Sequence, residues 1–252
     1  MNSKFRRRVL DACEAALTRR GFSRVRMHRN VLEISTDFQG WIGLCDGIYH
    51  DQVRITPALG VHCVPLMRLI CSTTGTRYRR SEFASIAYAL SDVKKGVAPF
   101  EFTSEESLVT ESERLASTME RYGIPFMRAF ASYEAVVSVS KARSGILGGY
   151  PEKAAAALYL MGRSDEARKW LDMQREPYRL DDAPAWQPFE TFAAKLLQIM
   201  DEEEVSSPIP VSPSSFYDKR WDYLREADVR NHGWALERQA ERMERYRSGS
   251  AS

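Results

Sequence analysis

The residue types best able to do chemistry gather in one short stretch of the first quarter of the chain. They are Cys45, Asp46, His50, Asp51, His62 and Cys63. Thiolate and imidazole groups are the ligands that zinc prefers. A thiol beside an imidazole base is also the arrangement that activates a cysteine nucleophile. A zinc site and a cysteine-based active site are therefore the two chemical hypotheses for this stretch.

The spacing of these residues favours a structural role over either chemistry. There is no Cys-x-x-Cys pair and no His-x-x-x-His pair, and His62 and Cys63 are adjacent, so on a strand they point to opposite faces. No Gly-x-Ser-x-Gly and no family-type cysteine signature is present. We expect the cysteines and histidines to fill the interior, and we predict no catalytic residue, no cofactor and no metal ligand. An enzyme that uses Cys63 with His50 or His62, or Cys45 with His62, stays open as an alternative.

The first 29 residues are strongly basic, with nine Lys and Arg against Asp11 and Glu14. Such a segment can contact phosphates. The candidate contacts are Arg6, Arg7, Arg8, Arg19, Arg20, Arg24 and Arg26, with Arg77, Arg79 and Arg80 in a later loop. The whole chain carries a net charge of only +2, and no RNA-binding motif or recognition helix accompanies the arginines. We favour a solvated helix face and keep nucleic-acid binding as an alternative.

The glycine-rich segment 145–149 lacks the flanking sequence features of a phosphate-binding loop. No Lys-Ser/Thr pair follows it and no clear strand precedes it, and a phosphate-binding loop needs both. We interpret it as a joint between helices.

Hydrophobic periodicity predicts a helix over 3–20, ended by Gly21, and then a meandering antiparallel sheet. Short β-rich runs cover 25–28, 31–36, 41–45 and 48–56, and Asp46-Gly47 is expected to form a hairpin turn. Residues 59–69 are compatible with an edge strand through Val61 and with a short helix from Pro65. For residues 83–93 we favour a strand.

The rest of the chain is predicted to be mainly helical. One helix is expected from Ser104, its N-cap, to Tyr122 with a stop at Gly123, and another from Pro125 that ends before Gly145. Further helices are expected over 152–161, 165–174 and 189–200. The fold class is therefore α+β: an N-terminal helix plus antiparallel sheet, followed by a mainly helical C-terminal half. The expected divisions are an α+β module over 1–145, a helical region over 146–205, a Pro/Ser linker over 206–215, and a charged helical segment over 216–247.

Residues 153–172 resemble a single tetratricopeptide-like helical hairpin. Small residues stand where two helices would touch, and Met161-Gly162-Arg163 marks the turn. No second copy is found, and a stable array needs about three repeats. The resemblance slightly favours a helical protein-binding surface.

Composition favours a cytoplasmic globular protein. Hydrophobic residues make up 44% and charged residues 28%, and there is no secretory signal or apolar run long enough for a membrane span. The four cysteines lack the regular spacing of a disulfide framework, so we expect them to be reduced.

The order of a helix, Arg20-Gly21-Phe22, strands with Arg29, and Gly60-Val61-His62 resembles uncharacterised bacterial α+β proteins found among polymorphic-toxin immunity proteins. The resemblance covers about the first 65 residues and implies a module that binds rather than catalyses. Immunity proteins against basic nucleases are usually acidic, whereas this chain is slightly basic, so a strongly basic nuclease is not the expected target. The sequence thus predicts a non-enzymatic protein-binding module, an immunity-type or defence-associated inhibitor whose partner is another protein such as a toxin.

Overall fold

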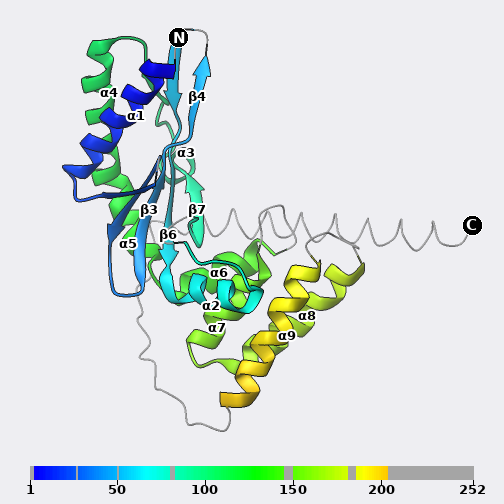
Figure 1. Cartoon of the computed structure of the whole chain (residues 1–252). Coiled ribbons are helices and arrows are strands. Elements are labelled where there is room, and N and C mark those ends of the chain that lie inside the picture. The colour runs from blue at the N-terminus through cyan, green and yellow to red at the C-terminus, as the bar shows by residue number, and fades with distance from the viewer. Residues whose placement is uncertain are drawn as a thin grey trace, which may run out of the picture. The chain divides into compact units, whose positions relative to one another are not determined.

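The computed structural model describes residues 3–26, 28–49, 51–79, 83–144, 150–180 and 186–203, without the side chains of 176–180, 186 and 203. Its described part divides into two compact units, one formed by the described residues of 1–64 and 79–131 and the other by those of 65–78 and 132–203. The first unit contains the sheets, and the second is helical (Figure 1). The predicted α+β class, with a helical C-terminal half, is confirmed. The predicted boundary after residue 145 lies within the second unit.

The first unit begins with an amphipathic helix and two antiparallel sheets. The elements are α1 (Ser3–Thr18), β1 (Ser23–Arg26), β2 (Arg29–Glu33), β3 (Phe38–Gly43), β4 (Asp46–Tyr49), β5 (Gln52–Ile55), β6 (Ala58–Cys63), β7 (Ile86–Ala89), α3 (Leu90–Val93), β8 (Phe100–Phe102), α4 (Glu105–Thr118), η1 (Met119–Gly123) and α5 (Ile124–Phe130). The five-stranded sheet has the order β1-β2-β3-β6-β7, and the three-stranded sheet has the order β4-β5-β8. The helix predicted over 3–20 is confirmed, and Gly21 follows it at φ +87°.

One long two-stranded ribbon joins the two sheets. β3 pairs with β6, and after Leu44 and Cys45 the same chain continues as β4, which pairs with β5. The Thr56 N–H donates to the Cys45 carbonyl at 2.8 Å, which links the two ladders. The expectation of a turn at Asp46-Gly47 is therefore wrong, because these residues open β4, and the hairpin closes beyond the Tyr49–Gln52 pair. The expectation of an edge strand through Val61 is also wrong, because β6, which contains Val61, lies between β3 and β7.

The helices of this unit pack on one side of the strands. α1 lies beside α4, α4 contacts β8, and α5 contacts β3 and β6 (Figure 1). A Cβ at Gly40 would lie 2.6 Å from the Met127 sulfur, so a larger residue there would require the Met127 side chain of α5 to shift. Tyr88 of β7 meets Phe126 of α5 edge to face at 5.6 Å.

The predicted stop at Gly123 is wrong, because the chain stays helical from α4 through the π-turn η1 into α5. Gly123 has an ordinary helical φ of −70°, and a Cβ there would meet Met119 at 3.2 Å and Leu59 at 3.6 Å. Gly123 therefore does not end the helix. The predicted N-cap is confirmed: the Ser104 hydroxyl accepts the Ser107 N–H.

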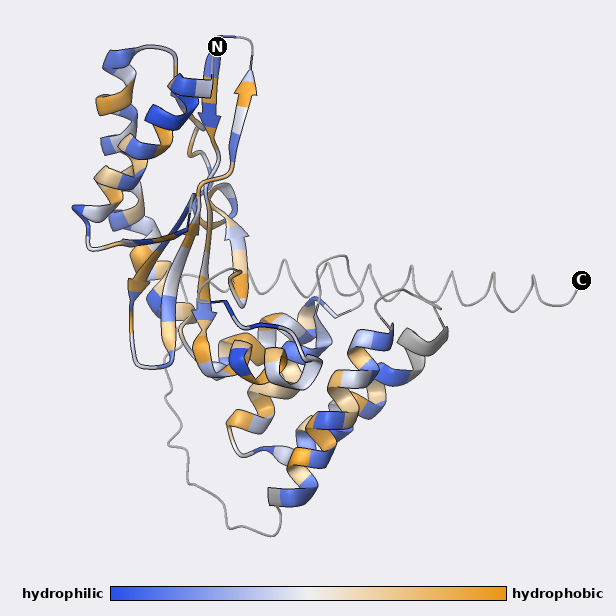
Figure 2. Cartoon of the chain, viewed as in Figure 1, coloured by the Kyte–Doolittle hydropathy of each residue, from blue (hydrophilic) through white to orange (hydrophobic). Residues whose placement is uncertain are grey.

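The second unit is built around a helix that is buried on almost every side. Its elements are α2 (Val64–Thr74), α6 (Tyr133–Ala142), α7 (Pro151–Leu160), α8 (Ser164–Leu180) and α9 (Trp186–Glu203). The run Ala154–Leu158 of α7 is fully buried, because α6, α8 and α9 all contact α7. Small alanines allow this close approach, and Trp170 of α8 donates its indole N–H to the Pro151 carbonyl at 3.0 Å. Figure 2 shows apolar residues concentrated on the central strands and on α7.

Candidate functional site

The structure separates the cysteine and histidine pair on which the enzyme alternative depends. His62 and Cys63 are consecutive in β6, and their side chains point to opposite faces of the sheet. Cys63 is fully buried, and the Nδ1 of His62 lies 2.7 Å from the Phe83 carbonyl, to which it can only donate. Cys45 is exposed, and His50 lies outside the described residues.

No metal centre emerges from the part of the chain that the structure describes. A search of those residues for three His, Cys, Asp or Glu side chains that could hold an ion found none. Burial raises the pKa of the Cys13 thiol to about 12, so this cysteine stays protonated. The glycine segment 145–149 and Arg80 lie outside the described residues.

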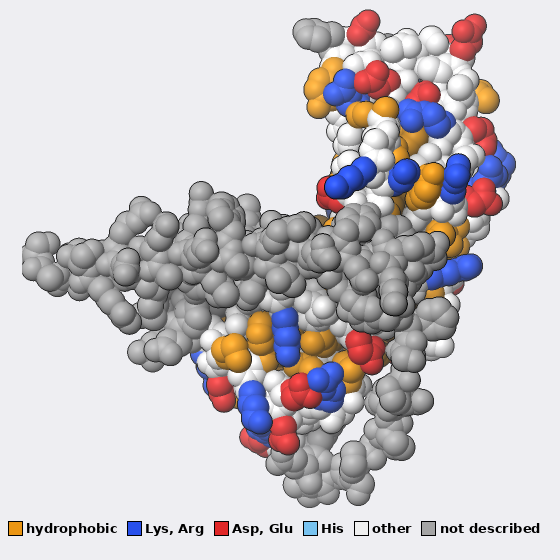
Figure 3. Space-filling view, turned by 180° about the vertical axis from the view of Figure 1, so that it is seen from behind, with side chains coloured by type: hydrophobic (Ala, Val, Ile, Leu, Met, Phe, Trp, Pro, Cys, Tyr) orange, Lys and Arg blue, Asp and Glu red, His pale blue; other side chains and the backbone are white. Residues whose placement is uncertain are grey.

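Carboxylates neutralise most arginines of the basic segment. The ion pairs are Arg6 with Asp46, Arg8 with Glu105, Arg19 with Glu113, Arg20 with Glu113 and Glu120, and Arg24 with Glu14. The hydrogen bond from Arg19 lowers the pKa of the Glu113 carboxyl, which keeps the pair charged. Arg7 and Arg26 are exposed. Figure 3 shows basic and acidic side chains interspersed over the described surface in view, so this face offers no purely positive patch.

Glu14 is a buried carboxylate that the sequence pattern did not single out. Its side chain is 7% exposed, one oxygen lies 2.8 Å from the Arg24 guanidinium, and the other accepts the backbone N–H of His28 at 3.2 Å. His28 has a φ of +66°, which a histidine adopts only at a cost that the surroundings must offset. Glu14 therefore fixes the β1–β2 turn against α1 and has a structural role.

The β4–β5 hairpin presents an edge that has no strand partner on one side among the described residues. β4 pairs with β5 only, and its Ile48 and Tyr49 are 51% and 49% exposed. Ile48 pairs with Val53, and Val53 pairs with Phe102, so the three apolar side chains form a row across the sheet. Val53 and Phe102 are fully buried, and Ile48 is the outermost member of the row. The row thus ends in a half-exposed branched side chain.

The outer face of the same hairpin carries an aromatic and a cation. The Arg54 guanidinium lies 4.8 Å from the Tyr49 ring centroid and donates to Glu101 at 2.7 Å. Gly47 pairs with Arg54, and a Cβ on Gly47 would lie 2.8 Å from the Tyr49 ring. The absence of a side chain at Gly47 therefore leaves room for an aromatic ring over the strand.

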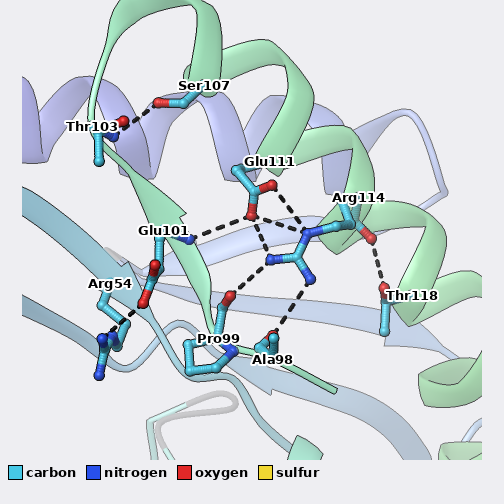
Figure 4. A network of polar contacts seen from close by, with 9 residues as sticks. All are labelled: Arg54, Ala98, Pro99, Glu101, Thr103, Ser107, Glu111, Arg114 and Thr118. Carbon is cyan, nitrogen blue, oxygen red and sulfur yellow. Dashed lines mark hydrogen bonds and ion pairs between the residues drawn. The ribbon is translucent and has the colours of Figure 1, made fainter. Parts of the chain in front are cut away.

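Side chains of α4 close the opposite edge of this small sheet (Figure 4). The Glu101 N–H of β8 donates to the Glu111 carboxylate at 3.4 Å, and the Arg114 guanidinium donates to the Pro99 carbonyl at 2.8 Å. Glu111 also pairs with Arg114, and the Arg114 guanidinium lies 4.2 Å from the Phe100 ring centroid. Side chains of α4 thus bind one backbone N–H of β8 and the carbonyl just before the strand, and they hinder the addition of a further strand at this edge.

The β1 edge of the larger sheet is protected in another way. Its pairing with β2 shifts register between Arg24 and Arg26, and a bulge with charged side chains discourages strand addition. Among the edges of β1, β4 and β8, β4 alone combines exposed apolar side chains with a regular ladder. We call Asp46–Tyr49, with its exposed Ile48 and Tyr49, the β4 edge.

The predicted helical hairpin over 153–172 corresponds to α7 and α8. Gly162 turns the chain at φ +70°, and Ala167 and Leu171 of α8 are buried in the second unit. This hairpin therefore serves the helical core of its unit. Among the described helices, none has both the length and the apolar composition that a membrane crossing requires.

Comparisons of this chain with protein-family models, with curated proteins and with solved structures found no match.

Proposed function

We propose that this chain is a non-enzymatic protein-binding module, and that immunity-type inhibition of a bacterial toxin is its concrete form. The observation that supports the proposal is the β4 edge, where an apolar row ends half-exposed beside an aromatic ring. Exposed backbone groups of an edge strand can add a strand from a partner, with flanking side chains giving specificity. Ile48 and Tyr49 would be the contacts on the two faces.

The placement of the reactive side chains supports binding over catalysis. A cysteine nucleophile needs a base within hydrogen-bond reach and access to substrate. Cys63 is fully buried, and the neighbouring His62 points to the other face, where it donates to a backbone carbonyl. These side chains serve packing and strand positioning.

A titration with a toxin domain encoded beside this chain's gene tests the proposal. Isothermal titration calorimetry should show a stoichiometric complex, and co-expression should rescue growth from the toxin. Ile48→Lys should weaken the complex at least tenfold, because a charge replaces the apolar margin of the edge. The matched control is Val109→Lys, since Val109 is 70% exposed on α4 and belongs to no strand edge. Absence of binding and of rescue would refute the immunity form of the proposal.

The nucleic-acid alternative makes a different prediction. Phosphate contacts make binding fall steeply with salt. Arg7 is exposed and Arg6 is paired with Asp46, so Arg7→Glu removes a solvent-facing cation and leaves that ion pair in place. Strong retention on heparin at physiological salt, lost in Arg7→Glu, would support the alternative over protein binding.

A further inference from the structure

We infer that two copies of this chain pair through the β4 edge, in antiparallel register, to form a dimer with one continuous six-stranded sheet. The inference uses the edge proposed above for partner binding, but it stands on the self-complementarity of that edge. The sheet would have the order β8-β5-β4-β4′-β5′-β8′, where the prime marks the second copy. Three features of the described structure lead to this arrangement.

The first feature is the pleat of the strand, which limits how β4 can meet a copy of itself. Side chains directly opposite in an antiparallel pair lie on the same face, and neighbouring residues alternate between faces. A two-fold axis perpendicular to the sheet must therefore pass between identical residues. A register that sets Gly47 opposite Ile48′ would oppose residues of different faces and is excluded.

The second feature is the fit of the register centred on Ile48. It places Ile48 beside Ile48′, so the buried rows of Val53 and Phe102 from both copies join into one apolar row. On the outer face it sets Gly47 opposite Tyr49′, and the Tyr49 ring of each copy lies over the Gly47 of its own strand, 2.8 Å from where a Cβ would stand. A register centred on Gly47 would instead oppose Ile48 with Asp46′.

The third feature is that the assembly closes. Glu111 accepts the Glu101 N–H of β8, and Arg114 binds the Pro99 carbonyl just before the strand, so side chains of α4 stand in the way of β4 from another copy. Head-to-tail growth is therefore blocked, and pairing in this sheet must be isologous, which gives a dimer rather than a fibre.

Charge does not oppose this pairing. Asp46 is already paired with Arg6 and is 7% exposed, so the edge brings no isolated carboxylate into the interface. The net charge of +2 produces little repulsion between copies. The paired strands are only four residues long, so we expect a weak dimer, with a Kd on the order of 10–100 µM.

Sedimentation velocity of the full chain over a concentration range from about 1 µM to about 1 mM tests the inference. The expected result is a monomer that becomes a dimer, with Ile48→Lys weakening the dimer at least tenfold and Val109→Lys leaving it unchanged. Hydrogen exchange should show amides of β4 becoming more protected as concentration rises. A monomer throughout the range, or a dimer that Ile48→Lys leaves intact, would overturn the inference.

The two proposals fail separately. A chain that dimerises as described but binds no toxin keeps the dimer and loses the immunity function. A chain that stays monomeric but binds the toxin through Ile48 keeps the function and loses the dimer. A chain that does both should lose its dimer on titration with the toxin, because one edge accepts one strand.

Discussion

Replacing Arg114 with methionine tests whether α4 closes the β8 edge. Arg114→Met keeps an unbranched apolar stem over the Phe100 ring but removes the guanidinium. The variant loses the hydrogen bond to the Pro99 carbonyl at 2.8 Å, the longer one to the Ala98 carbonyl at 3.4 Å, and the ion pair with Glu111. The carbonyls of Ala98 and Pro99, just before β8, therefore lose this donor, while Glu111 keeps only the Glu101 N–H.

The structure sets the size of this effect. Hydrogen bonds to charged groups contribute about 1.5–3 kcal/mol when buried, and the 38% exposure of the Arg114 side chain lowers that contribution. We expect a loss of about 1–2 kcal/mol in the free energy of unfolding, which corresponds to a Tm lower by roughly 2–8 °C in a chain of this size. Thermal unfolding followed by circular dichroism measures it.

A matched control separates the edge contacts from the mere loss of an ion pair. Arg163 makes an exposed pair with Glu166 three residues along the chain, and no hydrogen bond from its guanidinium to a backbone carbonyl is found in the described structure. Arg163→Met should cost less than about 0.5 kcal/mol. Equal Tm values for the two variants would refute the reasoning.

Three further predictions follow from burial. A maleimide should label Cys45 rapidly in the folded protein and Cys63 only after denaturation, as mass spectrometry of peptides would show, and fast native labelling of Cys63 would contradict the packing described here. Phe126→Ala should cost about 3–5 kcal/mol in urea unfolding, because the ring is fully buried against Tyr88, and a cost below about 1 kcal/mol would indicate a loose core. Burial lowers the pKa of Lys153 to about 8 from an ordinary value of 10.5, so the unfolded chain binds the extra proton between these values and stability rises with pH across that window. Lys153→Met should therefore raise the Tm at pH 7, and its advantage should vanish above about pH 10.5; a Tm difference that is the same at both pH values would refute this.

Local signals in the sequence determined many of the elements. The apolar spacing of α1 with Gly21 behind it, the Ser104 cap of α4, and the α7–α8 hairpin around Gly162 all depend on residues within a few positions of one another. Short-range hydrogen bonds and side-chain periodicity decide such features, so a single sequence predicts them.

The tertiary structure decided the features on which the candidate site depends. Asp46-Gly47 has the composition of a turn, yet Asp46 starts a strand, and Arg6, forty residues away, holds its carboxylate. Gly123 has the composition of a helix stop, yet it sits in a continuous helix that packs near Leu59 of a distant strand. The openness of β4 and the closure of β8 also depend on which strand lies beside which, and on the reach of Glu111 and Arg114 from α4. Contacts between distant segments contribute more free energy than a local turn preference, and one sequence does not reveal which segments will meet.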